Sequence, residues 1–271
     1  MPWSVKALVM TIGTLAATLL PQQILLEGIA VTIPNPFDYE RGISYMRHKY
    51  QQLYGEDLRQ GLSQKLGCNP TGIHFLNDAA AFLIGELDQG AAVGVRRGVG
   101  ITLGTGVGSA FTVAGQIAVH GLGIPPGGEI WNLPYRDGIV ETFLSTATIQ
   151  REYARLTGMP AEVHEIASFA REQPQAHQTF KHFGQELGRV LRYTCEAFAP
   201  ECIVLGGGIS RAATEFLNHT KNELVDLAIQ LRVSILFDHA ALIGAGMSWR
   251  QKHTQWEGSR NYTPNNFAEQ A

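Results

Sequence analysis

This 271-residue sequence has few cysteines, few charged residues and no metal-ligand spacing, and each of these features argues against a class of protein. The three cysteines, Cys68, Cys195 and Cys202, cannot all pair and none lies in a Cys-x-x-Cys spacing, so a reducing, cytoplasmic location is predicted. Charged residues make up 17% of the chain, the net charge is −3 and no lysine or arginine cluster stands out, which argues against a nucleic-acid partner. The nine histidines show no His-x-x-x-His or Cys/His ligand spacing, so no metal site is predicted.

Long apolar runs are also scarce. Residues 7–20 imitate the core of a signal peptide, but their apolar side chains recur at three- and four-residue steps, which favours an amphipathic helix over a cleaved signal. No other stretch is long enough to span a bilayer, so no membrane partner is predicted. What is abundant is glycine, with 30 residues, beside 45% hydrophobic residues; this composition is typical of a globular α/β protein with one large or two smaller domains.

Predicted strands and helices alternate along the chain, which indicates a layered α/β architecture. Strands are expected over residues 28–33, 73–76, 99–113 (as a hairpin), 203–205 and 234–237. Helices are expected over residues 5–20, 56–65, 78–87, 141–156, 161–171, 177–198, 212–231 and 240–250. Residues 35–54 are expected to be irregular, and residues 251–271 form a polar, aperiodic tail.

Asn77 and Asp78 stand where a predicted strand gives way to a helix. Considered alone, the pair is more typical of a helix N-cap, for which both residue types are preferred. The functional alternative is that Asp78, at the positive end of a helix, stays ionised and takes a proton from a hydroxyl.

Two glycine-rich segments are candidates for contact with a nucleotide. Residues 103–108 are followed by a strand instead of a helix, so they are not a dinucleotide-binding fingerprint. They suit either two strands that pinch around a triphosphate or an ordinary tight hairpin. Residues 205–210 run from a buried strand into a helix, which permits close approach of a ring or phosphate but equally serves helix–strand packing.

Glu129 and Glu141 supply two further carboxylates from a glycine-rich part of the chain. Paired acceptors suit a polyol, because carboxylates accept hydrogen bonds from neighbouring hydroxyls. Taken singly, both residues are more often surface acids or charges in the first turn of a helix.

The order of these motifs along the chain is more specific than any one of them. It resembles the ROK family of bacterial sugar kinases, which includes glucokinases, fructokinases, N-acetylhexosamine kinases and some transcriptional repressors. The segments that carry the resemblance are Asn77-Asp78-Ala79, Gly85-Glu86, residues 103–108, 127–130, 141–145, 205–209 and 242–245, within a span from about Glu27 to Met247.

The resemblance implies an α/β, actin-like (ribonuclease H-like) sugar-kinase fold with two domains around a cleft. Residues 1–95 would form a small N-terminal domain, incomplete and supplemented by the helix over 240–250. Residues 96–239 would form the large domain, and 251–271 the tail. A homodimer or higher homo-oligomer is expected.

The resemblance also implies roles for individual residues, with ATP and magnesium as cofactors and a sugar as the small-molecule partner. Asp78 would be the catalytic base. Asn77, Glu129, Asn132 and Glu141 would bind the sugar. Gly104, Thr105 and Gly106 would face the ATP phosphates, and Gly206, Gly207 and Gly208 the adenosine.

Three departures from the family pattern matter. The family's Asp-Xaa-Gly-Gly-Thr phosphate loop is absent, so the chain is expected to be a truncated or mis-started product or a degenerate paralogue with a truncated N-terminal domain. The family's zinc motif is absent, with Asn132 in place of its histidine and Ile139 in place of its last cysteine, so no structural zinc is expected. Pro34-Asn35 replaces the usual Pro-Gly of a sugar-facing loop.

Three functions therefore stay open. The first is ATP-dependent phosphorylation of a hexose or N-acetylhexosamine hydroxyl, with turnover lowered by the missing phosphate loop. The second is a non-catalytic protein that binds sugar or nucleotide, as a pseudokinase or regulator. The third is a kinase that uses polyphosphate, for which a positive groove would be the mark. A DNA-binding repressor is least favoured, since no helix-turn-helix segment precedes the kinase-like part.

Overall fold

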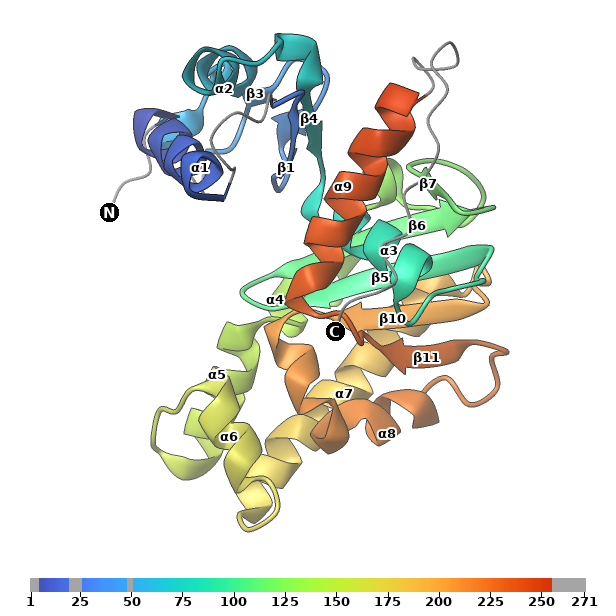
Figure 1. Ribbon diagram of the computed structural model, residues 1–271. Helices are drawn as coiled ribbons and strands as arrows, with labels where there is room; N and C mark the ends of the chain where they lie inside the picture. The colour runs from blue at the N-terminus through green and yellow to red at the C-terminus, as the bar shows by residue number, and fades with distance from the viewer. Residues whose placement is uncertain (1–4, 20–25, 48–50, 255–271) are drawn as a thin grey trace, which may run out of the picture.

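The computed structural model describes residues 5–19, 26–47 and 51–254 (Figure 1). Most of the predicted tail, residues 255–271, lies outside the described residues, as do residues 48–50 of the predicted irregular segment. The described chain builds a five-stranded sheet and three two-stranded sheets, with helices around them. The five-stranded sheet and the parallel two-stranded sheet are joined by a pair of helices that lie side by side.

The helices and strands have the following bounds. The helices are α1 (Val5–Leu19), α2 (Leu58–Leu66), α3 (Asp78–Gln89), α4 (Val140–Phe143), α5 (Thr146–Thr157), α6 (Val163–Phe169), α7 (Pro174–Cys195), α8 (Ala213–Asn222) and α9 (Asp238–Thr254). The strands are β1 (Ile29–Thr32), β2 (Phe37–Asp38), β3 (Ile43–Ser44), β4 (Ile73–Leu76), β5 (Arg97–Leu103), β6 (Val107–Val113), β7 (Gln116–Ala118), β8 (Pro134–Tyr135), β9 (Gly138–Ile139), β10 (Cys202–Gly206) and β11 (Gln230–Val233). Short 3-10 turns are η1 (Gln51–Leu53), η2 (Pro70–Gly72), η3 (Pro126–Gly128) and η4 (Gly208–Ala212).

The small-sheet region comprises α1 to β4. Strands β1 and β4 pair in parallel, with Ile29 opposite Ile73, and their carboxyl ends therefore point the same way. Helices α1 and α2 pack together, and apolar side chains from both, including Val9 and Leu62, share a cluster with Phe75 of β4. The segment predicted to be irregular contains the small β2–β3 hairpin.

The large-sheet region comprises β5 to β11. Its five-stranded sheet has the order β11-β10-β5-β6-β7, in which β10 is parallel to β5 and β11 while β5, β6 and β7 run antiparallel. Because β5 and β10 are parallel neighbours, the turns that follow them meet at one edge of the sheet. The two predicted glycine segments are these two turns.

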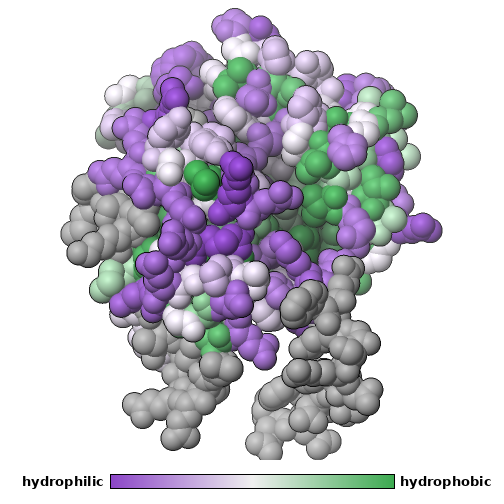
Figure 2. Space-filling model, turned by 90° about the horizontal axis from the view of Figure 1, so that it is seen from above, coloured by the Kyte–Doolittle hydropathy of each residue, from purple (hydrophilic) through white to green (hydrophobic). Residues whose placement is uncertain are grey.

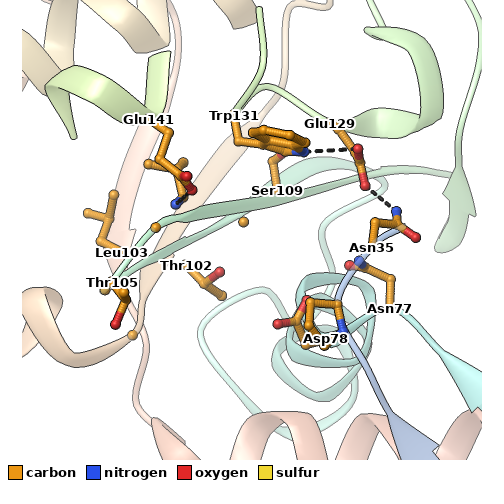
Figure 3. Close-up of a pocket in the computed structure, with 16 residues that line it drawn as sticks. Asn35, Asn77, Asp78, Thr102, Leu103, Thr105, Ser109, Glu129, Trp131 and Glu141 are labelled. Atoms are coloured by element: carbon orange, nitrogen blue, oxygen red, sulfur yellow. Dashed lines mark hydrogen bonds between the residues drawn. The ribbon is translucent and has the colours of Figure 1, made fainter. Parts of the chain in front are cut away.

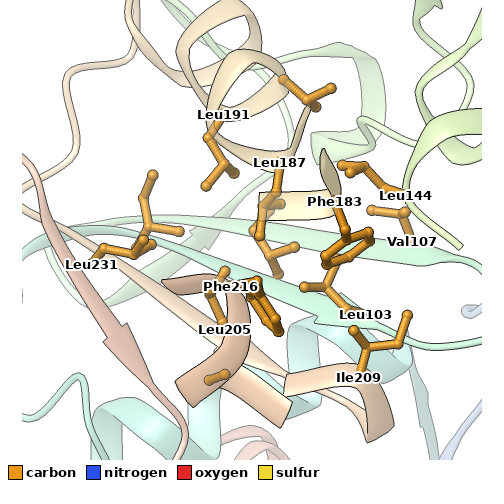
Figure 4. Packing of buried hydrophobic residues seen from close by; sticks show 14 of the residues in the cluster. Leu103, Val107, Leu144, Phe183, Leu187, Leu191, Leu205, Ile209, Phe216 and Leu231 are labelled. Atoms are coloured by element: carbon orange, nitrogen blue, oxygen red, sulfur yellow. The ribbon is translucent and has the colours of Figure 1, made fainter. Parts of the chain in front are cut away.

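The main core lies between the large sheet and helices α7 and α8 (Figure 4). Helix α7 presents an apolar stripe at three- and four-residue steps, with Phe180, Phe183, Leu187 and Leu191 all buried. Phe216 of α8 stacks against this stripe. Burying such a stripe fixes α7 against the strands that end at the glycine turns.

Helices α3 and α9 pack against each other at close range, and α9 also contacts β1. The approach depends on missing side chains, since a Cβ on Gly85 would overlap the carbonyl oxygen of Ala240 and one on Gly244 would overlap that of Ala81. Helix α3 also packs on β5 and β6. The predicted domain division stays a prediction, both in its boundaries at 95 and 239 and in the assignment of the helix over 240–250 to the N-terminal part.

Two predicted elements near the C-terminus are wrong. The helix expected over 212–231 ends at Asn222, and the last strand is Gln230–Val233, not 234–237. Gln230–Val233 pairs with β10, a partner distant in sequence that propensity alone cannot reveal. Residues 234–237 instead make a turn in which the Ser234 hydroxyl accepts a hydrogen bond from the Phe237 N–H at 2.7 Å.

Seen from above, the surface is mostly hydrophilic, with a smaller hydrophobic area (Figure 2). Large apolar side chains that stay exposed, such as Leu122, Val225 and Leu242, lie on different elements. Among the described residues, no helix combines the length and the hydropathy that a membrane span requires.

Candidate functional site

A cavity of about 580 Å³ lies between the two sheet regions (Figure 3). The small-sheet region contributes the segments directly after β1 and β4. The large-sheet region contributes the β5–β6 turn, the residue after β10, and residues around η3 and α4. Both sheets therefore point the carboxyl ends of parallel strands at one space, the usual place for ligands in open α/β sheets.

Asn77 and Asp78 enter this cavity at the start of α3. The Asn77 side chain is the helix N-cap, and its Oδ1 accepts hydrogen bonds from the Ala79 and Ala80 N–H groups at 2.9 and 3.1 Å. Asp78, the first residue of α3, is exposed toward the cavity. The cap and the functional alternative are thus compatible, because different residues of the pair serve them.

Tyr39 positions the Asn77 side chain through a hydrogen bond. The Asn77 Nδ2 donates to the Tyr39 hydroxyl at 3.4 Å, and that hydroxyl donates to the Ile33 carbonyl at 3.0 Å. Burial raises the pKa of the Tyr39 hydroxyl well above its usual range, with smaller contributions from the nearby carboxylates of Asp78 and Glu129. Tyr39 therefore acts as a neutral bridge between the β1 exit loop and the start of α3.

The β5–β6 turn presents Gly104, Thr105 and Gly106 to the cavity. A Cβ on Gly104 would have no neighbour within 4 Å, so packing does not explain this glycine. A Cβ on Gly106 would overlap the Glu141 carboxylate, whose Oε2 accepts a hydrogen bond from the Val107 N–H at 3.0 Å. One oxygen of Glu141 thus braces the turn, and Gly104 and the exposed Thr105 are left facing open space.

The three glycines at the end of β10 and in the turn after it also differ in whether packing requires them. Gly206 is required by the Phe82 ring, and Gly207, with φ of +80°, by close approach to the Leu103 backbone. Gly208 has no atom within 4 Å of where its Cβ would be. Packing accounts for two of the glycines and leaves Gly208 unexplained.

Glu129 is held from two sides. The Trp131 Nε1 donates to its Oε2 at 3.0 Å, and the Asn35 Nδ2 donates to its Oε1 (Figure 3). Asn35 comes from the loop after β1, so this second hydrogen bond crosses the cavity from the small-sheet region to the large-sheet region.

Most of the residues predicted for the site meet in this cavity. Those that line it are Asn77, Asp78, Gly104, Thr105, Gly106, Glu129, Glu141 and Gly207. Gly206, Gly208 and Asn132 are not lining residues, and Asn132 is exposed outside the cavity. Lining residues absent from the predicted site are Pro34, Asn35, Thr102, Leu103, Val107, Gly108, Ser109 and Trp131.

Two of the missed residues had a signal in the sequence. Asn35 departs from the family pattern of the sugar-facing loop, and Trp131 is a large aromatic residue directly after the Gly-Gly-Glu-Ile segment. Neither signal reveals that both side chains bind Glu129. Within residues 5–19, 26–47 and 51–254, no group of three or more histidine, cysteine, aspartate or glutamate side chains is arranged to hold a metal ion.

Comparison with known proteins agrees with this geometry. The sequence model of the ROK family matches residues 3–252. The glucokinase of Thermotoga maritima is 26% identical over 248 residues, which cover 80% of this chain and 77% of the glucokinase. The DNA-binding transcriptional repressor Mlc of Escherichia coli is 25% identical over 206 residues, which cover 69% of this chain and 50% of Mlc.

The fold also matches solved structures. A ROK family glucokinase from Streptomyces griseus, solved in complex with glucose and AMPPNP, superposes with a TM-score of 0.77 at 21% identity, over 93% of this chain and 89% of that one. The predicted α/β, actin-like sugar-kinase fold is thereby confirmed. The family match extends over nearly the whole described chain, and the chain belongs to the ROK family.

Proposed function

We propose that this protein transfers a phosphoryl group from ATP to a hydroxyl of a hexose or N-acetylhexosamine, with Asp78 as the general base. One observation carries the proposal: a carboxylate at the start of α3 shares a cavity with a glycine turn that has unexplained open space. Proton acceptor and phosphate cradle are the two parts that this transfer needs.

In this proposal the acceptor hydroxyl lies against Asp78, which takes its proton as the hydroxyl oxygen bonds to the γ-phosphorus of ATP and the bond from that phosphorus to ADP breaks. The N-terminal end of α3 favours the ionised carboxylate, because the first backbone N–H groups of a helix carry partial positive charge. Glu129 accepts hydrogen bonds from other hydroxyls and orients the ring. Glu141 has one oxygen bound to the turn and one left for such a contact.

The residues present fit a nucleotide. Gly104 and Gly208 have free space beside them, and Thr105 offers a hydroxyl at the cavity surface. Backbone N–H groups of glycine turns bind phosphate oxygens well. When bound, ATP supplies the phosphoryl group, and magnesium, held chiefly by phosphate oxygens and water, neutralises its charge.

The relatives support this class of reaction. The Thermotoga maritima protein is a glucokinase, and the Streptomyces griseus glucokinase binds glucose and AMPPNP. Identities near 25% do not transfer a particular sugar, because a few pocket contacts decide between hexoses.

A second candidate is a sugar- or nucleotide-binding protein without turnover. One observation favours it: protein N–H groups already occupy both carboxylate oxygens of Glu129 and one oxygen of Glu141. The similarity to Mlc also favours this candidate, because Mlc is a transcriptional repressor.

The test is ADP release from magnesium-ATP with glucose, fructose, mannose, N-acetylglucosamine and N-acetylmannosamine in turn, with polyphosphate as a second donor. We expect sugar-dependent ADP release. Its rate should be about 10²–10⁴-fold lower in Asp78→Asn, which is the usual contribution of a positioned general base. Asp88→Asn, on the exposed side of the same helix, is the matched control and should keep the wild-type rate. Absence of sugar-dependent release from any donor, with sugar binding retained, would favour the second candidate.

A further inference from the structure

We propose that Asn35 determines which sugars enter the pocket, because its side-chain amide occupies Glu129 and must be displaced by a sugar hydroxyl. We call the contact between these two side chains the Asn35–Glu129 latch. The inference rests on the proposed function in that it assigns the pocket to a polyol.

The latch joins the two sheet regions. Asn35 follows β1 and Glu129 follows η3, and their hydrogen bond spans the cavity that both residues line. Trp131 donates to the other oxygen of Glu129 at 3.0 Å. Both carboxylate oxygens are therefore bound by side-chain N–H groups of the protein itself.

The segment that carries Asn35 is anchored on both sides, so the amide is held in place. Before it, the Ile33 N–H donates to the Leu76 carbonyl and the Ile33 carbonyl accepts from the Tyr39 hydroxyl, both at 3.0 Å. After it, the Pro36 carbonyl accepts from the Tyr45 N–H at 3.0 Å. A side chain on such a short, anchored segment loses little entropy when it binds Glu129.

The position of the amide makes it a competitor of the ligand. In Figure 3 the Asn35 side chain is drawn between Glu129 and Asn77, and these three residues line the same cavity as Asp78. A hexose that reaches both Asp78 and Glu129 must use this space. The amide N–H and a sugar hydroxyl are the same kind of group toward a carboxylate, since each donates one hydrogen bond.

It follows that the latch lowers sugar affinity and favours acceptors that place a hydroxyl on Glu129. A hydrogen bond to a charged group is among the stronger ones in proteins. We expect its removal in Asn35→Ala to tighten sugar binding about tenfold, which corresponds to about 1.4 kcal/mol.

Calorimetry with the sugar panel, without nucleotide, measures this affinity independently of turnover. The matched control is Asn218→Ala, an exposed asparagine on α8, which should bind as the wild type does. Hydrogen exchange of the ligand-free protein gives a second measurement: the backbone amides within residues 33–38 that carry a hydrogen, which excludes the two prolines, should exchange faster in Asn35→Ala and in Glu129→Ala. The double variant should add nothing further, because both changes break the same contact.

The outcomes separate the latch from the proposed kinase activity. Faster exchange with tighter sugar binding supports the latch, whether or not ADP is released. A second outcome is that exchange is faster in both single variants and no faster in the double variant, while the protein binds none of the sugars. This outcome supports the Asn35–Glu129 contact and counts against the sugar kinase. Unchanged exchange in Asn35→Ala overturns the proposal, and so does weaker sugar binding, which would make Asn35 a ligand of the sugar and not its competitor.

Discussion

At the scale of single residues, two glycines of the β5–β6 turn have opposite surroundings. Gly104 has open space where a Cβ would be, whereas Gly106 faces the Glu141 carboxylate that braces the turn. We expect Gly106→Ala to displace Glu141 from the Val107 N–H and to lower the free energy of unfolding by about 1–2 kcal/mol. Urea unfolding of the variant and the wild type measures this difference.

Gly104→Ala is the matched substitution two residues away. It meets no protein atom, so we expect the free energy of unfolding to stay within about 0.5 kcal/mol of the wild-type value. If Gly104 faces a phosphate, the added methyl should weaken binding of a non-hydrolysable ATP analogue about tenfold, or about 1.4 kcal/mol. A variant that binds the analogue as the wild type does would contradict the assignment of this turn to the nucleotide.

At the scale of elements, the crossing of α3 and α9 depends on glycine at one position and not at another. A methyl on Gly244 would overlap the Ala81 carbonyl, while Gly246 on the same helix has nothing within 4 Å. We expect Gly244→Ala to cost about 1–3 kcal/mol of unfolding free energy, as overpacking does. Gly246→Ala should instead stabilise by about 0.5–1 kcal/mol, because alanine has the higher helix propensity. Thermal unfolding of both variants decides the point, and equal shifts would contradict the close crossing.

At the scale of the whole molecule, His74 links stability to pH. It lies on β4, with its Nε2 2.8 Å from the Ser248 hydroxyl of α9, and its buried Nδ1 has no hydrogen-bond partner among the described residues. Burial, with smaller contributions from the positive charges of Lys252, His253 and Arg59, lowers the pKa of His74 to about 4.

The sign of the pH effect follows from this lowered pKa. An unfolded histidine has a pKa of about 6.5, so between about pH 6.5 and pH 4 the unfolded chain binds a proton that the folded chain does not. Stability due to this group is complete above pH 6.5 and is lost as the pH falls to about 4. We expect the wild type to lose more unfolding free energy between pH 7 and pH 5 than His74→Gln, in urea titrations at both pH values. Equal losses would show that His74 does not titrate in this window.

The sequence predicted the local features well. The strand Ile73–Leu76 and the start of α3 at Asp78 are confirmed, because an asparagine cap after an apolar strand is a signal carried by neighbouring residues. The hairpin of β5 and β6 is confirmed for the same reason, since its glycine turn lies between two apolar runs. The strand Gln230–Val233 was missed because its partner, β10, lies outside any local pattern.

Motif order along the chain was by itself enough to determine the ROK family and its fold, because those motifs are contiguous segments whose turns and caps form from adjacent residues. Tertiary structure alone decided what each residue does in the cavity. It separated Gly104 and Gly208, which have open space, from Gly106, Gly206 and Gly207, which packing requires. It also joined Asn35 to Glu129, 94 positions later. Such contacts depend on how distant segments pack, and packing is a property of the folded chain and not of any window of the sequence.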